Sequence, residues 1–138
     1  MDNISENIDR RKVNLSFHKA ERLCSKKIID KLFVEGKSLF IYPVKMVYLE
    51  GKLPSGYPAQ TAFAVSKKSF KRAVQRNLIK RRMREAYRLN KSGFYDEIGE
   101  KQVAVFFIYA GKTISEYRLI ETAIKKGIKK LLAELKAA

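Results

Sequence analysis

The sequence has few of the residues that build disulfides, metal centres and catalytic triads. Among its 138 residues there are one cysteine, Cys24, one histidine, His18, and no tryptophan. A lone cysteine cannot form a disulfide within the chain, which fits a reducing compartment. A lone histidine without a second ligand at metal-binding spacing is a poor metal-site candidate. We therefore expect no disulfide and no metal ion bound directly by the protein.

Long hydrophobic runs are also missing. The longest extends from Val103 to Ala110, whereas a membrane-spanning helix needs about 20 apolar residues. The first residues, MDNISENIDRR, lack the apolar core of a signal peptide. The sequence therefore predicts a cytoplasmic protein that does not cross a membrane.

Acidic residues are scarce, and they are scattered. Fourteen Asp and Glu face thirty Lys and Arg, which gives a formal net charge of +16. No acid is paired with His18 or with another acid at a spacing typical of a nuclease site, and no phosphate-binding glycine loop is present. We therefore expect no catalytic residue on the protein. So much positive charge on one domain favours a polyanionic partner, either a nucleic acid or a membrane surface.

The positive charge is concentrated between Ser66 and Asn90, where ten Lys and Arg accompany one acid, Glu85. On a helix with about 3.6 residues per turn, the part after Ser69 separates into two stripes. The polar stripe contains Asn77, Lys80, Arg81, Arg84 and Arg88. The apolar stripe contains Ile79, Met83 and Ala86. Burial of the apolar stripe would leave the basic side chains pointing outward at fixed spacing, an arrangement suited to nucleic-acid phosphates.

Two other interpretations of this stretch are open. Basic runs are often solvated faces, but one acid cannot neutralise ten bases, and the apolar stripe argues for an ordered helix. A membrane-surface helix would use the same charges, but here the apolar stripe is narrow and contains no Phe or Trp. Nucleic-acid binding is therefore the favoured hypothesis.

A hydrophobic content of 46% indicates a globular fold. The first expected elements are a helix that Ser25 caps and Gly36 ends, a strand Phe40–Leu49, a loop Glu50–Pro58 and a strand Gln60–Val65. The basic helix follows, and we expect it to end near Asn90, where Ser92-Gly93 breaks it. A strand Gln102–Tyr109 and a last helix, with Thr113 and Glu116 at capping-box spacing, complete the chain. This order, α-β-β-α-β-α, indicates an α+β fold with a small sheet and helices packed on it. Residues 1–16 are expected to form a flexible N-terminal arm, and residues 17–138 a single RNA-binding domain.

Together these features resemble the protein subunit of bacterial ribonuclease P. The matching stretches are FHKAERLCSKKIIDKLFVEGKS from Phe17 to Ser38, Val65-Ser66-Lys67-Lys68, and RNLIKRRMREAY from Arg76 to Tyr87. The chain departs from the family pattern at two places. Leu78 stands where the second arginine is usual, and the turn Ser69-Phe70-Lys71-Arg72 is longer than usual and lacks a glycine.

The resemblance implies a ribosomal-protein-like fold with a left-handed βαβ crossover, contrary to the usual hand. It also implies that a catalytic RNA carries the active site and removes the 5′ leader of precursor tRNA, with Mg²⁺ coordinated mainly by that RNA. The protein would bind both RNAs, and no protein partner would be required. The alternatives are a structural ribosomal or RNA-chaperone protein with no processing role, and a nuclease that acts without RNA.

Two groups of residues are expected to form the binding surfaces. By charge and by resemblance, the RNA-binding residues are Ser66, Lys67, Lys68, Lys71, Arg72, Arg76, Asn77, Lys80, Arg81, Arg84 and Arg88. By resemblance alone, the residues that line a groove for the single-stranded leader are Ile29, Phe33, Lys45 and Val47. Ile29 stands where the family often has an aromatic residue, so we expect weaker base stacking there.

Overall fold

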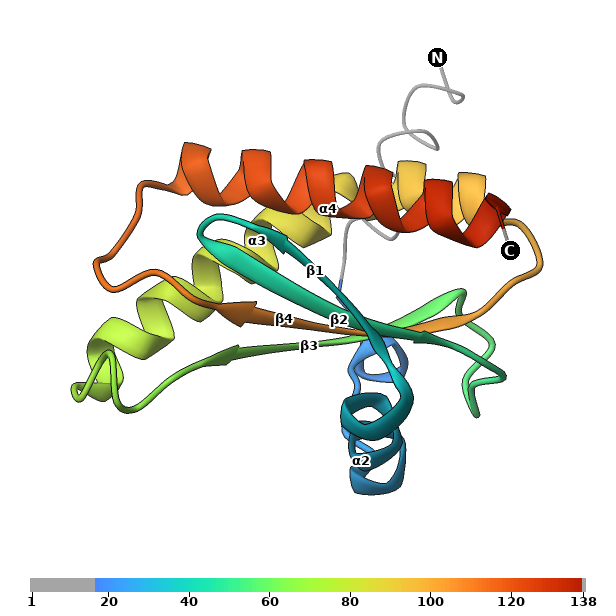
Figure 1. The fold of residues 1–138 in the computed structure, drawn as a ribbon, viewed down its shortest axis with the longest axis horizontal. Helices are drawn as coiled ribbons and strands as arrows, with labels where there is room; N and C mark the ends of the chain where they lie inside the picture. The colour runs from blue at the N-terminus through green and yellow to red at the C-terminus, as the bar shows by residue number, and fades with distance from the viewer. Residues whose placement is uncertain (1–16, 138) are drawn as a thin grey trace, which may run out of the picture.

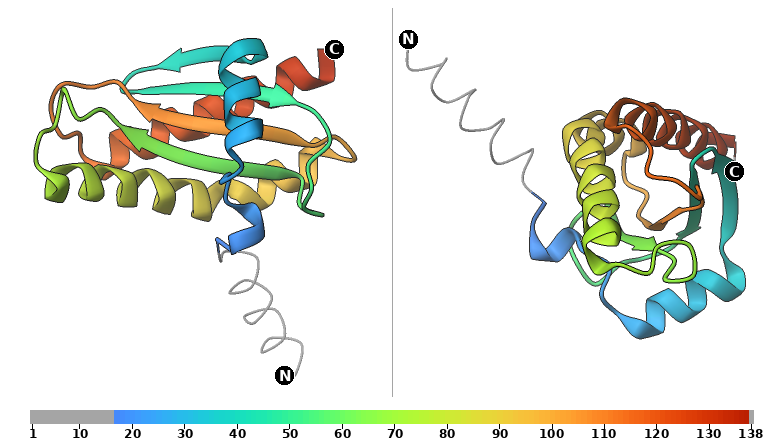
Figure 2. Two further views of the ribbon diagram at one scale, coloured as in Figure 1. Left: turned by 90° about the horizontal axis from the view of Figure 1, so that it is seen from below. Right: turned by 90° about the vertical axis from the view of Figure 1, so that its left-hand side faces the viewer.

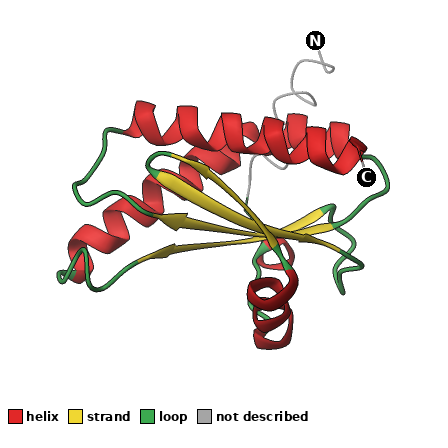
Figure 3. Cartoon of the chain, viewed as in Figure 1, coloured by secondary structure: helices red, strands yellow, loops and turns green. Residues whose placement is uncertain are grey.

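A four-stranded sheet separates two layers of helix (Figures 1 and 3). The computed structural model describes residues 17–137, so the expected arm, 1–16, lies outside the described residues. The elements in chain order are the 3₁₀ helix η1 (Lys19–Glu21), α2 (Lys26–Glu35), β1 (Lys37–Ile41), β2 (Val44–Glu50), β3 (Ala59–Val65), α3 (Ala73–Ile98), β4 (Val103–Tyr109) and α4 (Tyr117–Ala137). This arrangement confirms the α+β class. Within residues 17–137, no helix combines the length and the hydropathy needed to span a bilayer.

The sheet has the strand order β1-β2-β4-β3. β1 pairs with β2 and β2 with β4 in antiparallel fashion, whereas β3 and β4 are parallel neighbours joined through α3. In the left view of Figure 2, α2 lies in front of the sheet and α3 returns behind it. With the two parallel strands turned to point upward, β4 lies to the right of β3. A crossover behind the sheet that moves to the right is left-handed, as the resemblance implies.

Each face of the sheet has its own hydrophobic core. α3 and α4 cover one face, and the shorter α2 covers part of the other (Figure 1). The larger core, on the side of α3 and α4, includes Met46, Tyr87 and Phe107. The smaller core, on the side of α2, includes Leu32 and Val47. Because α2 has only 10 residues, its face of the sheet is incompletely covered.

α2 has the boundaries that its sequence predicts. The Ser25 hydroxyl oxygen accepts a hydrogen bond from the Ile28 amide at 3.4 Å, and Gly36 donates its amide to the Leu32 carbonyl at 2.8 Å. Gly36 has an ordinary φ of −70°, so it is not required for its backbone conformation. It is required for space, because a Cβ there would lie 2.2 Å from the Leu32 carbonyl oxygen.

Gly36→Ala is therefore expected to destabilise the protein by about 2–3 kcal/mol, since the methyl group would push the end of α2 away from β2. Urea denaturation of the two proteins measures this difference. Gly51→Ala is the matched control, because a Cβ at Gly51 has nothing within 4 Å. Equal stabilities of the two variants would contradict the steric account.

The strand expected over Phe40–Leu49 is in fact two strands. β1 and β2 form a hairpin in which Ile41 lies opposite Val44, and the turn is Tyr42-Pro43, with a cis peptide bond. Pro43 has no N–H to donate to a ladder, so strand pairing stops beside it. Apolar residues continue on both sides of the proline, and this continuity conceals the turn in the sequence.

The basic helix is longer than expected. Ser92-Gly93 does not break it, and α3 continues to Ile98, after which Gly99 has a φ of 70°. A glycine inside a helix costs about 1 kcal/mol relative to alanine. Burial of Phe94 and Ile98 in the larger core offsets that cost.

The last helix begins later than the capping-box spacing indicates. α4 starts at Tyr117, and the Glu116 carbonyl accepts the Leu119 amide at 3.1 Å. The Thr113 carbonyl instead accepts a hydrogen bond from the Tyr109 hydroxyl. Thr113 therefore belongs to a loop that is fastened to the end of β4.

Candidate nucleic-acid interface

The turn between β3 and α3 presents its lysines to solvent because its apolar residue is anchored inside. Phe70 is buried, and its ring centroid lies 5.8 Å from that of Tyr109. The Ser66 side-chain oxygen accepts the Lys68 amide at 3.1 Å, and the Ser66 carbonyl accepts the Phe70 amide at the same distance. The predicted contact residues of this turn, all of them exposed, are Ser66, Lys67, Lys68, Lys71 and Arg72.

Arg76 closes this turn from the first part of α3. Its Nη1 donates to the carbonyl oxygens of Phe70 and Lys71, each at 2.8 Å. The guanidinium group therefore replaces the missing glycine as the feature that fixes the path of the turn. An RNA contact by Arg76 stays a prediction, and its observed role is to position the neighbouring lysines.

The buried side of α3 fixes the direction of the basic side. Ile79, Met83, Ala86 and Tyr87 are fully buried against the sheet and α4, which confirms the predicted apolar stripe. Because the helix cannot rotate without exposing them, the opposite side chains are held outward. A rigid helix thus presents the cations, as the sequence indicates.

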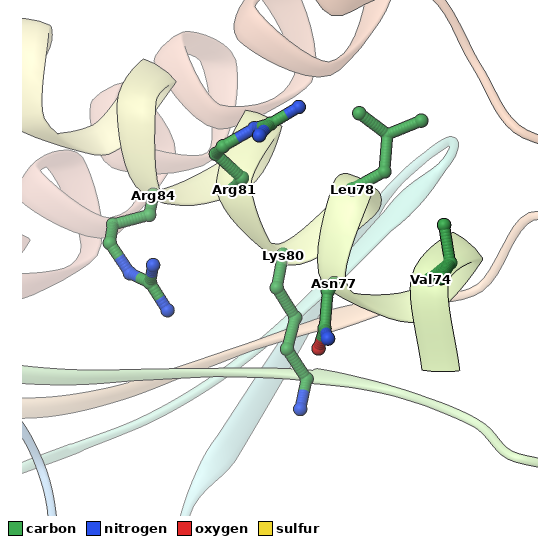
Figure 4. A pocket seen from close by; sticks show the side chains of 6 residues that line it. All are labelled: Val74, Asn77, Leu78, Lys80, Arg81 and Arg84. Carbon is green, nitrogen blue, oxygen red and sulfur yellow. The ribbon is translucent and has the colours of Figure 1, made fainter. Parts of the chain in front are cut away.

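The outward side chains occupy two flanks of the helix, whereas the sequence suggested one stripe. Asn77, Lys80 and Arg84 extend from one flank, and Val74, Leu78 and Arg81 extend from the other (Figure 4). Together these six residues line a shallow hollow on α3. Arg84 also lines a second hollow with Thr61 and Ala62, so its flank is the one beside the β3 edge.

The cations of the interface differ in their protein partners. Within residues 17–137, no carboxylate lies within 4.0 Å of the charged groups of Lys80, Arg81 or Arg84. Arg88 instead donates to Glu85, with Nη2 2.6 Å from Oε1, and this hydrogen bond lowers the pKa of the Glu85 carboxyl. Arg88 is therefore engaged by a carboxylate, in contrast to Lys80, Arg81 and Arg84.

The sheet face beside α2, where the resemblance implies a groove, carries several side chains that are only partly buried or exposed. Phe33 is 52% exposed, and its ring centroid lies 5.3 Å from that of Phe106 on β4. Ile29 is partly buried, and Lys45 is exposed on β2. Val47, in contrast, is buried in the core under α2. Ile29, Phe33 and Lys45 are thus partly or fully accessible beside α2, whereas Val47 lies in the core; a groove lined by the first three stays a prediction.

Two further residues on the sheet face beside α2, Phe106 and Ile108, were not predicted from the sequence. Phe106 and Ile108 lie opposite Val47 and Lys45 in the β2–β4 register and are only partly buried. The apolar run from Gln102 to Tyr109 predicts a strand buried on both faces. The two residues that remain accessible on the α2 side have no signal of their own in the sequence, because their exposure depends on the shortness of α2.

The known proteins that resemble this chain agree with one another. The family model described as Ribonuclease P matches residues 17–136. Two relatives are each named Ribonuclease P protein component. The one from Porphyromonas gingivalis is 37% identical over 112 residues, which cover 80% of this chain and 82% of the relative. The one from Chlorobium phaeobacteroides is 36% identical over 123 residues, which cover 80% of this chain and 84% of the relative.

Solved structures support the same fold. The RNase P protein from Staphylococcus aureus has a TM-score of 0.64 and 23% identity, covering 82% of this chain and 96% of that one. The RNase P protein from Thermotoga maritima has the same TM-score and identity, covering 80% and 96%. At this level of identity the two structures establish the fold, and the sequence relatives carry the family assignment.

Proposed function

The chain belongs to the ribonuclease P protein family, and from this premise we propose that it binds two RNAs, a catalytic RNA and the 5′ leader of precursor tRNA. The RNA carries the active site and cuts the leader off, and the protein supplies binding and orientation. The proposal places the protein in the cytoplasm and requires no protein partner. One observation carries it: Lys80, Arg81 and Arg84 project from a rigid helix, and no described acid pairs with them.

The two flanks of α3 suit two RNA surfaces. The flank with Leu78 and Arg81 faces away from the β3 edge and would contact phosphates of the catalytic RNA. The exposed lysines Lys67 and Lys68 of the preceding turn would add to this contact. The flank with Lys80 and Arg84 lies beside that edge and would contact the leader. A leucine at position 78 contributes apolar surface to the first flank but no phosphate contact.

The groove beside α2 suits an unpaired strand better than a duplex. Phe33 offers exposed aromatic surface on which unstacked bases pack, with the partly buried Phe106 ring beside it, and Lys45 offers a cation to the backbone. A duplex would keep its bases inside and would not use the aromatic rings. The leader of a precursor tRNA is such an unpaired strand, whereas mature tRNA does not have it.

Mg²⁺ is the expected cofactor, but the side chains that the structure describes offer no clustered donor set for it. Residues 17–137 contain no group of three His, Cys, Asp or Glu side chains that could hold a metal ion. We therefore assign Mg²⁺ to the RNA. The cations of the protein would neutralise nearby phosphates, which reduces the repulsion that otherwise opposes compact RNA metal sites.

Reconstitution with a cognate catalytic RNA tests the proposal. The protein should restore leader cleavage at Mg²⁺ concentrations too low for the RNA alone. Binding to the RNA without any gain in leader cleavage would instead favour a structural or RNA-chaperone role. Cleavage by the purified protein without RNA would place the active site on the protein and overturn the proposal.

Binding to the catalytic RNA is expected to depend strongly on salt. If about five phosphates are contacted, the slope of log K against log salt is about −3.5 to −4.5, because each contact releases condensed counterions. Filter binding over a series of KCl concentrations measures this slope. A flat response would contradict a phosphate interface built on Lys67, Lys68 and Arg81.

A further inference from the structure

Two arginines, Arg22 and Arg84, line one hollow beside the edge of the sheet. This hollow is lined by Phe17, Arg22, Leu23, Thr61, Ala62, Phe63 and Arg84. Arg22 comes from the segment between η1 and α2, and Arg84 comes from the middle of α3. Both views of Figure 2 show the start of the described chain lying beside α3. Two cations from distant parts of the sequence therefore line one hollow.

Arg22 is held in place by its backbone and by an aromatic ring. It forms a β-bridge with Thr61, and the adjacent Leu23 donates its amide to the Thr61 carbonyl at 3.0 Å. Its guanidinium carbon lies 5.7 Å from the centroid of the Phe17 ring. That ring in turn packs edge-on against Phe63, with a centroid distance of 5.9 Å. The cation is thus oriented by cation–π attraction without loss of its charge.

The segment that carries Arg22 is fastened to α3 by a buried ion pair. The carboxylate Oε1 of Glu21 lies 2.6 Å from Lys91 Nζ and 2.7 Å from the Tyr95 hydroxyl, and its Oε2 accepts the His18 amide at 2.7 Å. Glu21 is fully buried. Burial raises the pKa of the Tyr95 hydroxyl, which keeps it protonated as a donor. Arg22, the next residue, therefore has a fixed position relative to Arg84.

The two arginines that line the hollow have no acidic partner among the described residues. Within residues 17–137, no carboxylate is within ion-pair distance of Arg22 or Arg84. Two guanidinium groups that share one hollow repel each other unless an anion lies between them. Guanidinium groups bind phosphate oxygens in a bidentate manner, and the Phe17 ring beside them suits a sugar or base.

We propose that Arg22 and Arg84 form a binding site for one backbone phosphate of the RNA leader. The site rests on the proposed function, because it extends the leader path past the β3 edge toward η1. Ala62 lines the hollow and also packs with the core on the groove side of the sheet. Ala62 lies opposite Phe106 in the β3–β4 register, so the hollow adjoins the sheet face proposed for the leader, which favours the leader over the catalytic RNA as the source of the phosphate.

Arg22→Gln in the reconstituted holoenzyme tests this site. We expect about tenfold weaker binding of a precursor tRNA with a long leader, and a salt slope smaller by about 0.7, the value for one contact on a single strand. Binding of the catalytic RNA by the free protein should not change. Arg22→Lys keeps the charge and should keep the salt slope. Arg118→Gln, an exposed arginine on α4, is the matched control.

Each result of these measurements supports or overturns the proposed phosphate site at Arg22 and Arg84. Arg22→Gln should unfold in urea like the unmodified protein, because the side chain is exposed and the bridge to Thr61 uses only backbone atoms. Unchanged precursor binding would overturn the site. Equal losses for leaderless tRNA, or weaker binding of the catalytic RNA, would show that the phosphate does not belong to the leader. Failure of the unmodified protein to assemble with any catalytic RNA would instead overturn the proposed function itself.

Discussion

Glu21→Gln is expected to lower the free energy of unfolding by about 3–5 kcal/mol, because it leaves the Lys91 ammonium buried without its carboxylate. The pair lies at an Nζ–Oε1 distance of 2.6 Å, and both side chains are at most 2% exposed. Removing one member of a buried pair is far more costly than the net contribution of the pair, since the remaining charge cannot return to water. Urea denaturation followed by circular dichroism measures the difference.

Glu97→Gln provides the matched control for this measurement. Glu97 also pairs with a lysine, Lys136, at 3.7 Å, but both side chains are more than half exposed. Exposed pairs contribute about 0–1 kcal/mol, so this variant should be nearly as stable as the unmodified protein. Similar losses for Glu21→Gln and Glu97→Gln would show that the buried pair has no special role. The double replacement of Glu21 and Lys91 by apolar residues should recover part of the loss.

Local patterns in the sequence predicted the elements that depend on local rules. The Ser25 cap and the Gly36 stop delimit α2 correctly, and the period of the apolar residues gives the buried side of α3. Both features are decided within a few residues of chain. The turn at Pro43 is also local, but the apolar residues on both sides of it are typical of one continuous strand, as predicted for Phe40–Leu49.

Long-range contacts account for what the sequence did not reveal. Glu21 and Lys91 are 70 residues apart, and no period or motif connects them. Lys91 directly follows the basic run Ser66–Asn90, yet it is buried, while Arg84 within the run is exposed. The partial exposure of Phe106 likewise depends on how much of the sheet α2 covers. Tertiary packing decides all three features, and a single sequence contains no local pattern that reveals this packing.

Simultaneous replacement of Lys80, Arg81 and Arg84 by Gln is expected to weaken formation of the complete complex with the catalytic RNA and precursor tRNA by about 10²- to 10³-fold. The physical reason is the loss of up to three charge-assisted phosphate contacts on a helix that cannot rotate to offer others. The salt slope should fall by about 2–3. Folding should survive, because Arg81 and Arg84 are exposed and Lys80 is outside the hydrophobic core.

A control with the same total charge separates this surface from non-specific attraction. Replacing Lys126, Lys129 and Lys130 on α4 by Gln also lowers the formal net charge from +16 to +13, and all three lysines are exposed. If net charge alone governed binding, the two triple variants would lose affinity equally. A loss confined to the α3 variant would show that RNA recognises the geometry of this helix. Equal losses of affinity would show that α3 contributes only through the net positive charge of the protein.

The single variants then distinguish the two flanks of α3. Arg81→Gln should weaken assembly with the catalytic RNA more than it weakens binding of a leader to the assembled enzyme, because Arg81 extends from the flank opposite Asn77, Lys80 and Arg84. Arg84→Gln should affect leader binding more, since Arg84 also lines the hollow beside β3. Identical profiles for the two variants would mean that the whole helix contacts one RNA, and the division into two surfaces would be wrong.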